Sequence, residues 1–225
     1  MSATQLEQAA QATKTAFVFP GQGSQKAGML AELAEQFSAI RETFAEASEA
    51  VGFDLWQIAQ TGENLNQTEF TQPVLLTASI ALWRVWLESG GVAPKYLAGH
   101  SLGEYSALVA AGSLSLGDAV KLVNLRGKLM QTAVPQGVGA MAAILGLDDA
   151  KVIELCAQAT AAGEGSVEAA NYNAQGQVVV AGNKDRVEAV MALAKENSAK
   201  AIALPVSVPS HCSLMNPAAE QFAPA

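Results

Sequence analysis

The sequence predicts an α/β fold in two parts. In the first half, short apolar runs that stop at glycine or proline alternate with longer segments of helical periodicity, which is typical of parallel strands joined by helices. From about residue 139 the pattern changes to the order β-α-β-β-α-β. Half of the 225 residues are apolar and only 15% are charged, so the chain can form a sizeable core.

The first half begins with a short strand and continues with helices. Residues 16–19 are apolar and stop at Pro20, and we interpret them as a buried parallel strand. Helical patterns cover about residues 29–51. We expect the next helix to begin at Pro73, because proline suits the first helical position, and to end just before Gly90.

A second strand leads directly to a serine. Residues 96–98 form this strand, and the segment Gly99-His100-Ser101-Leu102-Gly103 then opens a helix that continues to about residue 111. A G-x-S-x-G pattern between strand and helix is typical of the nucleophile elbow, in which glycines without a Cβ allow a tight turn. We therefore predict that Ser101 is a nucleophile. The alternative is a serine that only caps the following helix.

The helix that begins at Ser115 carries a cation among apolar residues. Ser115 and Asp118 have the spacing of a capping box. At about 100° per residue, Arg126 falls in the middle of an apolar arc. The opposite side is polar and holds Lys121, Asn124, Lys128 and Gln131. A guanidinium on a core-facing stripe is costly unless it meets an anion. Two interpretations stay open: a structural pair or a side chain that reaches water, and a clamp on a substrate carboxylate.

The second half predicts an inserted ferredoxin-like unit. Its order of strands and helices, β-α-β-β-α-β, is that of the ferredoxin-like motif. The expected strands are residues 139–147, 167–170, 177–181 and 201–206, and the expected helices are residues 149–162 and 184–196. We therefore assign residues 135–207 to an inserted subdomain. Residues 1–134 and 208–225 then form the subdomain that carries the serine.

A nucleophilic serine needs a base and an oxyanion hole. The chain has two histidines, His100 and His211. The side chain of His100, beside the serine, should point away from it and help to shape the site, so His211 is the stronger candidate for the base, with a loop histidine as the alternative. The backbone N–H of Leu102 is one expected oxyanion donor. The loop 20–23, which includes Gln22, is placed to supply the second.

Composition excludes several classes of function. The net charge is −8 with no basic run, which argues against nucleic-acid binding. The two cysteines have no metal-site spacing, and we expect reduced thiols in a cytoplasmic protein. Residues 1–14 lack the apolar core of a signal peptide. Arg84 interrupts the longest apolar stretch, so no membrane span is expected.

Taken together, the motifs resemble those of the malonyl-CoA:acyl carrier protein transacylases, the malonyl-loading enzymes of type II fatty acid synthesis. They occur in the order of that family and cover most of the chain. The matching segments are Phe19-Pro20-Gly21-Gln22-Gly23-Ser24-Gln25, Thr71-Gln72-Pro73, Gly99-His100-Ser101-Leu102-Gly103-Glu104-Tyr105, Arg126-Gly127, Gly176-Gln177-Val178-Val179 and Val208-Pro209-Ser210-His211.

The resemblance implies a role for each site residue. Ser101 is then the nucleophile, His211 its base, and Arg126 the residue that holds the free carboxylate of the malonyl group. The amides of Gln22 and Leu102 form the oxyanion hole, and His100 lines the site. The implied substrates are malonyl-CoA, a coenzyme A thioester, and acyl carrier protein, with no bound cofactor or metal. The implied fold is an α/β hydrolase-like subdomain that carries the ferredoxin-like one, in a protein expected to be a monomer.

The resemblance also implies a longer chain. Family members continue well past the position of Ala225, and that part completes the large subdomain and supplies a carbonyl that orients the histidine. We therefore expect the hydrolase-like subdomain of this sequence to be incomplete at its C-terminus. Three alternatives remain open: a serine esterase or thioesterase with the same elbow, an acyltransferase domain of a polyketide synthase, and a non-catalytic module that binds the carrier protein.

Overall fold

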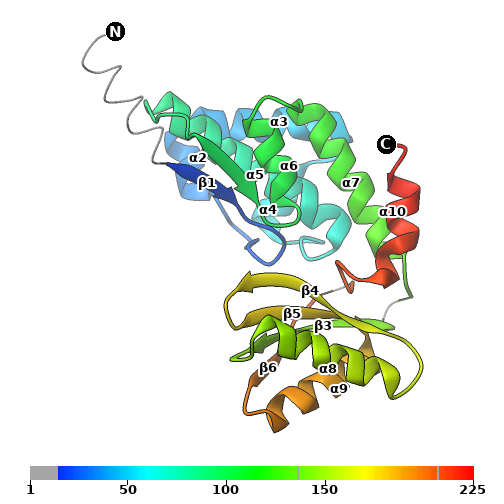
Figure 1. The fold of residues 1–225 in the computed structure, drawn as a ribbon. Coiled ribbons are helices and arrows are strands. Elements are labelled where there is room, and N and C mark those ends of the chain that lie inside the picture. Colours follow the sequence, from blue (N-terminus) through cyan, green and yellow to red (C-terminus); the bar gives the residue numbers. More distant parts are fainter. Residues whose placement is uncertain (1–14, 136, 207) are drawn as a thin grey trace. The chain divides into compact units, whose positions relative to one another are not determined.

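The computed structural model describes residues 15–135, 137–206 and 208–225 (Figure 1). Contacts divide the chain into two compact units, Met1–Gly127 and Lys128–Ala225. The subdomain boundaries expected from the sequence, residues 135–207 for the inserted part, stay a prediction. Residues 1–14, for which no signal peptide is expected, lie outside the described residues. Within the described part of the chain, no helix combines the length and the hydropathy that crossing a bilayer requires.

The first unit contains two parallel strands and a set of helices. Strand β1 (Ala16–Phe19) pairs with β2 (Tyr96–Gly99), with Phe17 opposite Leu97. The helix α6 that follows β2 contacts both strands. The helices are α2 (Ala31–Gln36), α3 (Ser38–Val51), α4 (Leu55–Thr61), α5 (Thr68–Glu88), α6 (Gly103–Ala110) and α7 (Leu116–Thr132), the last of which continues into the second unit. The capping role expected of Ser115 is confirmed, because its Oγ accepts from the N–H of Asp118 at 3.0 Å. The Asp118 carboxylate accepts from the Ser115 hydroxyl at 2.6 Å, which differs from the backbone N–H contact of a full capping box.

The core of the first unit is formed mainly by helices. Its fully buried side chains come from α3, α4, α5, α7 and the residue that follows Ser101; the largest are Ile40, Phe44, Leu55, Leu76, Ile80 and Leu102. The apolar run at β1 was expected to be a buried strand, and this is only partly so. Phe19 is 5% exposed but Val18 is 77% exposed. An apolar run indicates a strand, but its burial depends on which elements cover each face.

Helix α5 begins earlier than expected. It starts at Thr68, and Pro73 lies inside it instead of at its first position. A proline in a helix interior has no N–H for the carbonyl four residues before it, which here belongs to Glu69. Asn124 of α7 replaces that donor, because its side-chain Nδ2 donates to the Glu69 carbonyl oxygen at 2.9 Å. The helix therefore continues through the proline without leaving this carbonyl unpaired.

The position of Asn124 corrects a second expectation. The helical projection placed it on the polar side of α7, but it is only 8% exposed. Next to it in the sequence, Leu125 is 37% exposed, so α7 presents a polar residue to α5 and an apolar one outward. Helical periodicity distinguishes apolar from polar residues, and it cannot identify a polar side chain that is buried because a neighbouring helix lacks a donor.

The second unit is a four-stranded antiparallel sheet with two helices. The sheet has the order β4-β5-β3-β6. Its elements follow the predicted alternation of strands and helices: β3 (Gly139–Leu145), α8 (Asp149–Ala161), β4 (Val167–Ala174), β5 (Gln177–Asn183), α9 (Lys184–Glu196) and β6 (Lys200–Ala203). Strand β4 continues four residues beyond its expected end at residue 170, and β6 ends at Ala203 instead of residue 206. A short 3-10 turn, η1 (Ser213–Met215), and helix α10 (Asn216–Phe222) follow.

Alternate residues of this sheet enter two different apolar clusters. Ala142, Ile144, Val178 and Val180 pack with residues of α8 and α9. Met141, Val179 and Ala181 instead pack with Cys212 of the segment before η1. Successive side chains of a strand point to opposite faces of a sheet. One face of the sheet is therefore covered by two helices and the other by the segment that carries His211.

The hydrogen bond between Asn124 and α5 yields a stability prediction. Asn124→Ala should lower the free energy of unfolding by about 1–3 kcal/mol, because it leaves the Glu69 carbonyl, in a partly buried contact, without its donor. In a Pro73→Ala background the same change should cost clearly less, because the introduced alanine has an N–H that can bond to the Glu69 carbonyl. Urea unfolding of the four proteins of this cycle measures the coupling, with Lys121→Ala on the exposed side of α7 as the control. Equal costs in both backgrounds would contradict this account.

Candidate active site

The turn between β2 and α6 places Ser101 in a strained conformation. Its φ is +52°, in the left-handed region that side chains other than glycine rarely adopt. The turn is tied down on both sides: the N–H of His100 donates to the Phe19 carbonyl at 3.0 Å, and the N–H of Glu104 donates to the Ser101 carbonyl at 3.1 Å. Such strain, worth about 1–3 kcal/mol, persists only where the surroundings hold it, and it is frequent at active sites.

The glycines of the motif are required because the start of α6 lies very close to the ends of β1 and β2. A Cβ on Gly103 would lie 2.1 Å from the Phe19 carbonyl oxygen, and one on Gly99 would lie 1.9 Å from the Gly103 carbonyl carbon. These distances are far below van der Waals contact, so α6 can start against the ends of both strands only when neither residue has a side chain. The expectation of a tight strand-to-helix turn at Ser101 agrees with this geometry.

Arg126 of α7 contacts the serine. Its Nη2 donates to Ser101 Oγ at 3.3 Å, and its Nη1 donates to Gln72 Oε1 at 2.7 Å. The guanidinium carbon also lies 5.8 Å from the centre of the Tyr105 ring. Among the described residues, the ion pairs join Arg84 to Glu46, Lys151 to Glu154 and Arg186 to Asp185. A structural ion pair of Arg126, one of the open interpretations, is therefore not observed in that part of the chain.

The partial burial of this cluster shifts its titration. Loss of water lowers the pKa of Arg126 below its usual range, while nearby Tyr105 and Glu104 act in the opposite direction. Burial also raises the pKa of Tyr105, which the charge of Arg126 partly offsets. Because arginine remains protonated in proteins, the site presents a permanent, poorly solvated cation next to the serine hydroxyl. Such a cation favours an anionic ligand.

The loop after β1 lies at the same edge of the sheet as the serine, because β1 and β2 are parallel neighbours. In this loop the Gln22 side chain donates from Nε2 to Thr68 Oγ1 at 3.2 Å. A Cβ on Gly21 would lie 2.9 Å from Nδ1 of His100, so the His100 ring packs beside this loop. Leu102, the first residue after the serine, is buried at the N-cap position of α6.

His211 belongs to the second unit and lies in the segment that covers one face of its sheet. His211 has a φ of +63° and is exposed. The next residue, Cys212, is buried against Met141 and Val179, and its Sγ donates to the Pro209 carbonyl at 3.1 Å. His211 is therefore displayed at a strained turn whose neighbouring side chain is anchored in the sheet.

The acyl transferase domain family matches residues 16–225. This chain belongs to the acyl transferase domain family. It is 59% identical over 215 residues to the malonyl CoA-acyl carrier protein transacylase of Escherichia coli. The matched residues cover 94% of this chain and 69% of that relative. It is 50% identical over 213 residues to the transacylase of the same name from Bacillus subtilis, covering 93% of this chain and 67% of that one.

Solved structures of this family have the same fold, of mixed α/β class. A crystal structure of FabD from Acinetobacter baumannii has a TM-score of 0.94 and 81% identity, covering 95% of this chain and 68% of that one. A malonyl-transacylase in complex with a type II PKS acyl-carrier protein has a TM-score of 0.89 and 54% identity, covering 92% of this chain and 68% of that one. This acyl transferase chain therefore spans roughly two thirds of these relatives.

One residue of the candidate site, Gln72, was not predicted from the sequence as a site residue. Gln72 is fully buried on α5 and holds one side of the Arg126 guanidinium. The motif Thr71-Gln72-Pro73 supports the family resemblance, but by itself it assigns no role to Gln72. A buried glutamine within an apolar helix is a signal in itself, because such a side chain requires a hydrogen-bond partner. Its partner, 54 residues away, becomes visible only in the fold.

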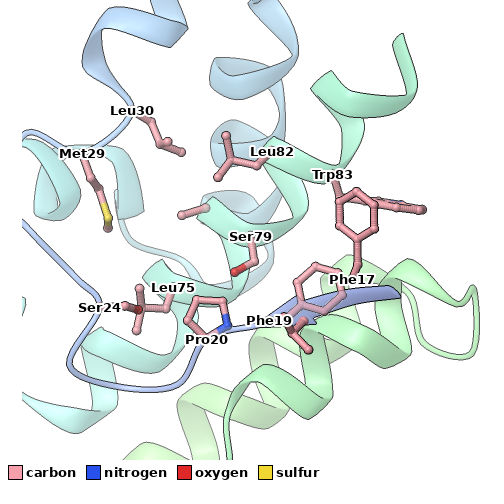
Figure 2. A pocket seen from close by; sticks show the side chains of 12 residues that line it. Phe17, Phe19, Pro20, Ser24, Met29, Leu30, Leu75, Ser79, Leu82 and Trp83 are labelled. Atoms are coloured by element: carbon pink, nitrogen blue, oxygen red, sulfur yellow. The ribbon is translucent and has the colours of Figure 1, made fainter. Parts of the chain in front are cut away.

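An apolar cavity of about 350 Å³ lies between β1 and α5 of the first unit (Figure 2). Its lining includes Phe17, Phe19, Leu75 and Trp83, together with Ser24 and Ser79. None of its described lining residues is titratable, so we assign it no role in the chemistry of this acyl transferase domain. Among the described residues there is also no cluster of three or more histidine, cysteine, aspartate or glutamate side chains that suits a metal ion.

The close approach at the elbow can be tested with two alanine substitutions. Gly103→Ala should destabilise the protein by several kcal/mol or prevent folding, because its Cβ would collide with the Phe19 carbonyl oxygen. Gly117→Ala on α7 is the matched control, because a Cβ there meets only Ala50 at an ordinary 3.8 Å. The control should be neutral or stabilising by about 0.5–1 kcal/mol. Thermal unfolding compares the two, and a neutral Gly103→Ala variant would refute the steric account.

Proposed function

We propose that this protein is a malonyl-CoA:acyl carrier protein transacylase, which transfers a malonyl group from coenzyme A to the phosphopantetheine thiol of acyl carrier protein. The reaction supplies malonyl units for fatty acid synthesis. The observation that supports it best is the contact of a partly buried Arg126 with the hydroxyl of a strained Ser101. A nucleophile beside a permanent cation suits an acyl group that carries its own carboxylate.

In the first half-reaction we assign Ser101 as nucleophile and His211 as general base. The imidazole of His211 takes the proton of the Ser101 hydroxyl, and Oγ attacks the thioester carbonyl carbon of malonyl-CoA. The backbone N–H groups of Gln22 and Leu102 stabilise the oxyanion, and each such donor is worth about 3 kcal/mol. The tetrahedral intermediate then collapses, coenzyme A leaves as a thiol with the proton from His211, and a malonyl-serine ester remains.

The second half-reaction follows the same path in reverse. His211 takes the proton of the phosphopantetheine thiol, whose sulfur attacks the ester carbonyl. The Ser101–acyl bond then breaks, the serine recovers its proton from His211, and malonyl-acyl carrier protein leaves. A double displacement of this kind needs no redox group, and we expect no bound cofactor or metal to take part. The carrier protein as partner is supported by the related transacylase structure in complex with one.

Arg126 is the proposed specificity residue. In a malonyl group the carboxylate lies two bonds beyond the carbonyl that the serine attacks, so a cation that touches Ser101 Oγ is within reach of it. Gln72 holds Nη1, which orients the guanidinium toward the serine. Acetyl groups lack the carboxylate and would leave the cation unpaired in a partly buried site. Hydrogen bonds to a charged group contribute roughly 1.5–3 kcal/mol, which is about ten- to hundredfold in rate.

We also propose a subdomain assignment for each of the two units. We interpret the first unit as the α/β hydrolase-like part, supported by its parallel strands and the strand-to-helix turn at Ser101. We interpret the second unit as the ferredoxin-like part, supported by the sheet order β4-β5-β3-β6. A monomeric state and a cytoplasmic location stay predictions. No observation favours an esterase, a polyketide synthase domain or a non-catalytic carrier-binding module.

Acyl-enzyme formation tests the assignment of the nucleophile. After incubation with malonyl-CoA, the protein should gain the mass of one malonyl group, and Ser101→Ala should gain none. His211→Ala should acylate far more slowly, because the serine then lacks its base. Intact-mass spectrometry with peptide mapping measures both effects, with the exposed Ser113→Ala as the control. A malonyl group found on another residue would overturn the assignment.

Acyl selectivity tests the role of the guanidinium. Arg126→Ala should reduce acylation by malonyl-CoA about ten- to hundredfold while acylation by acetyl-CoA changes little. Only the malonyl group has a carboxylate whose contact with Arg126 the substitution removes. Arg84→Ala is the control, because Arg84 belongs to the same unit and pairs with Glu46 away from the site. Rates of acyl-serine formation from the two thioesters decide the question. Equal losses for malonyl and acetyl would exclude a carboxylate clamp.

A further inference from the structure

The segment that carries His211 is anchored by apolar side chains on both sides of the histidine. Before it, Val208 is buried with Met130, Met215 and Ala218. After it, Cys212 is buried against the sheet. Apolar packing of this kind is strong but non-directional. It holds the segment on the sheet, but it does not by itself define how the turn at His211 is rotated.

Besides hydrogen bonds within the segment, such as the one from Cys212 Sγ to the Pro209 carbonyl, the turn receives directional contacts from Glu168 of strand β4. The N–H of Ser213 donates to Glu168 Oε1 at 3.2 Å, and the hydroxyl of Ser213 donates to the same carboxylate oxygen. Ser166 Oγ lies 3.3 Å from Ser213 Oγ. Because the Ser213 proton is directed to the carboxylate, the Ser166 hydroxyl is the donor in that pair. Glu168 therefore receives two bonds from a residue 45 positions later in the chain.

These bonds act close to a strained residue. His211 has a φ of +63°, so its conformation persists only if the flanking residues hold it. Ser213 lies two residues beyond it and begins the 3-10 turn η1. A carboxylate that accepts two hydrogen bonds forms charge-assisted contacts, which are shorter and stronger than neutral ones. The pair therefore has both the direction and the strength to fix the C-terminal side of the turn.

We propose that Glu168 is a positioning residue for His211, which acts by holding Ser213 through two hydrogen bonds and thereby sets the orientation of the imidazole. This inference rests on the proposed function, in which His211 is the general base. Glu168 need not touch the substrate. Its contribution is geometric, because a displacement of a catalytic group by about 1 Å can cost up to ~10²-fold in rate.

The pKa of the neighbouring Cys212 thiol is consistent with a nearby Glu168 carboxylate. Burial raises the pKa of Cys212, and the negative charge of Glu168 raises it further, whereas a backbone hydrogen bond at Leu214 acts in the opposite direction. The net direction keeps the thiol protonated at neutral pH. Although Cys212 is adjacent to the proposed base, it is therefore a poor competitor of Ser101 for the acyl group.

The test uses variants that remove the acceptor or keep it. Glu168→Ala removes the carboxylate, whereas Glu168→Gln keeps an oxygen acceptor of the same length. Ser213→Ala removes the hydroxyl bond but leaves the backbone bond. Glu188→Ala is the matched control, because Glu188 is an exposed glutamate of α9 in the same unit. Malonyl transfer to acyl carrier protein and thermal unfolding are measured for each protein.

We expect Glu168→Ala to lower kcat about tenfold, with KM for malonyl-CoA within about twofold of the parent protein. Glu168→Gln should recover most of the lost kcat, and Ser213→Ala should be intermediate. The double variant Glu168→Ala/Ser213→Ala should be no slower than Glu168→Ala alone, because both changes break one contact. An unchanged kcat in Glu168→Ala, or an equal loss in Glu188→Ala, would overturn the proposal. So would a loss of kcat that Glu168→Gln does not recover.

Hydrogen exchange separates this inference from the function on which it rests. Backbone amides of residues 212–215 should exchange faster in Glu168→Ala than in Glu188→Ala, whether or not the protein is active. If the parent protein forms no malonyl-serine, the proposed function fails, and faster exchange would still establish the contact between Glu168 and the turn. If acylation proceeds and exchange is unchanged, the proposed function stands and the positioning role of Glu168 is refuted.

Discussion

The close approach of helix α6 to the ends of strands β1 and β2 is the constraint on which the candidate site depends. It requires that Gly103 has no side chain, because a Cβ would lie 2.1 Å from the Phe19 carbonyl oxygen. The approach forces the chain to reverse sharply between strand and helix, and Ser101 takes the left-handed conformation that this reversal demands. The strain at Ser101 is therefore a consequence of packing, and the surrounding backbone hydrogen bonds maintain it.

The pairing of α5 with α7 determines where the cation lies. Pro73 removes the donor for the Glu69 carbonyl, and Asn124 supplies a replacement from α7. Two residues later on α7, Arg126 meets Gln72, the neighbour of that proline. The hydrogen bond that replaces the missing donor and the contact between Arg126 and Gln72 thus use the same pair of helix surfaces. Both contacts hold α7 against α5, so the guanidinium has a defined position beside Ser101 instead of reaching solvent.

In the second unit, the alternation of side chains on one sheet serves two purposes. One set of residues packs under α8 and α9 and stabilises the unit. The other set forms a surface on which the segment around Cys212 lies, with Glu168 of β4 holding Ser213. The sheet is therefore a support for the turn that displays His211. Apolar contacts anchor that turn, and under our proposal the Glu168 carboxylate provides direction.

The sequence alone determined the elbow, the order of elements and the cation among apolar residues, because these are local: glycine spacing, hydrophobic period and capping residues act over a few positions. The helix α9 (Lys184–Glu196) and the capping role of Ser115 were predicted for that reason. Tertiary structure alone decided that Pro73 lies inside a helix, that Asn124 is buried, that Val18 is exposed, and that Gln72 orients Arg126. Each of these depends on a partner distant in the sequence, and no local pattern identifies which donor meets which acceptor once helices and strands pack together.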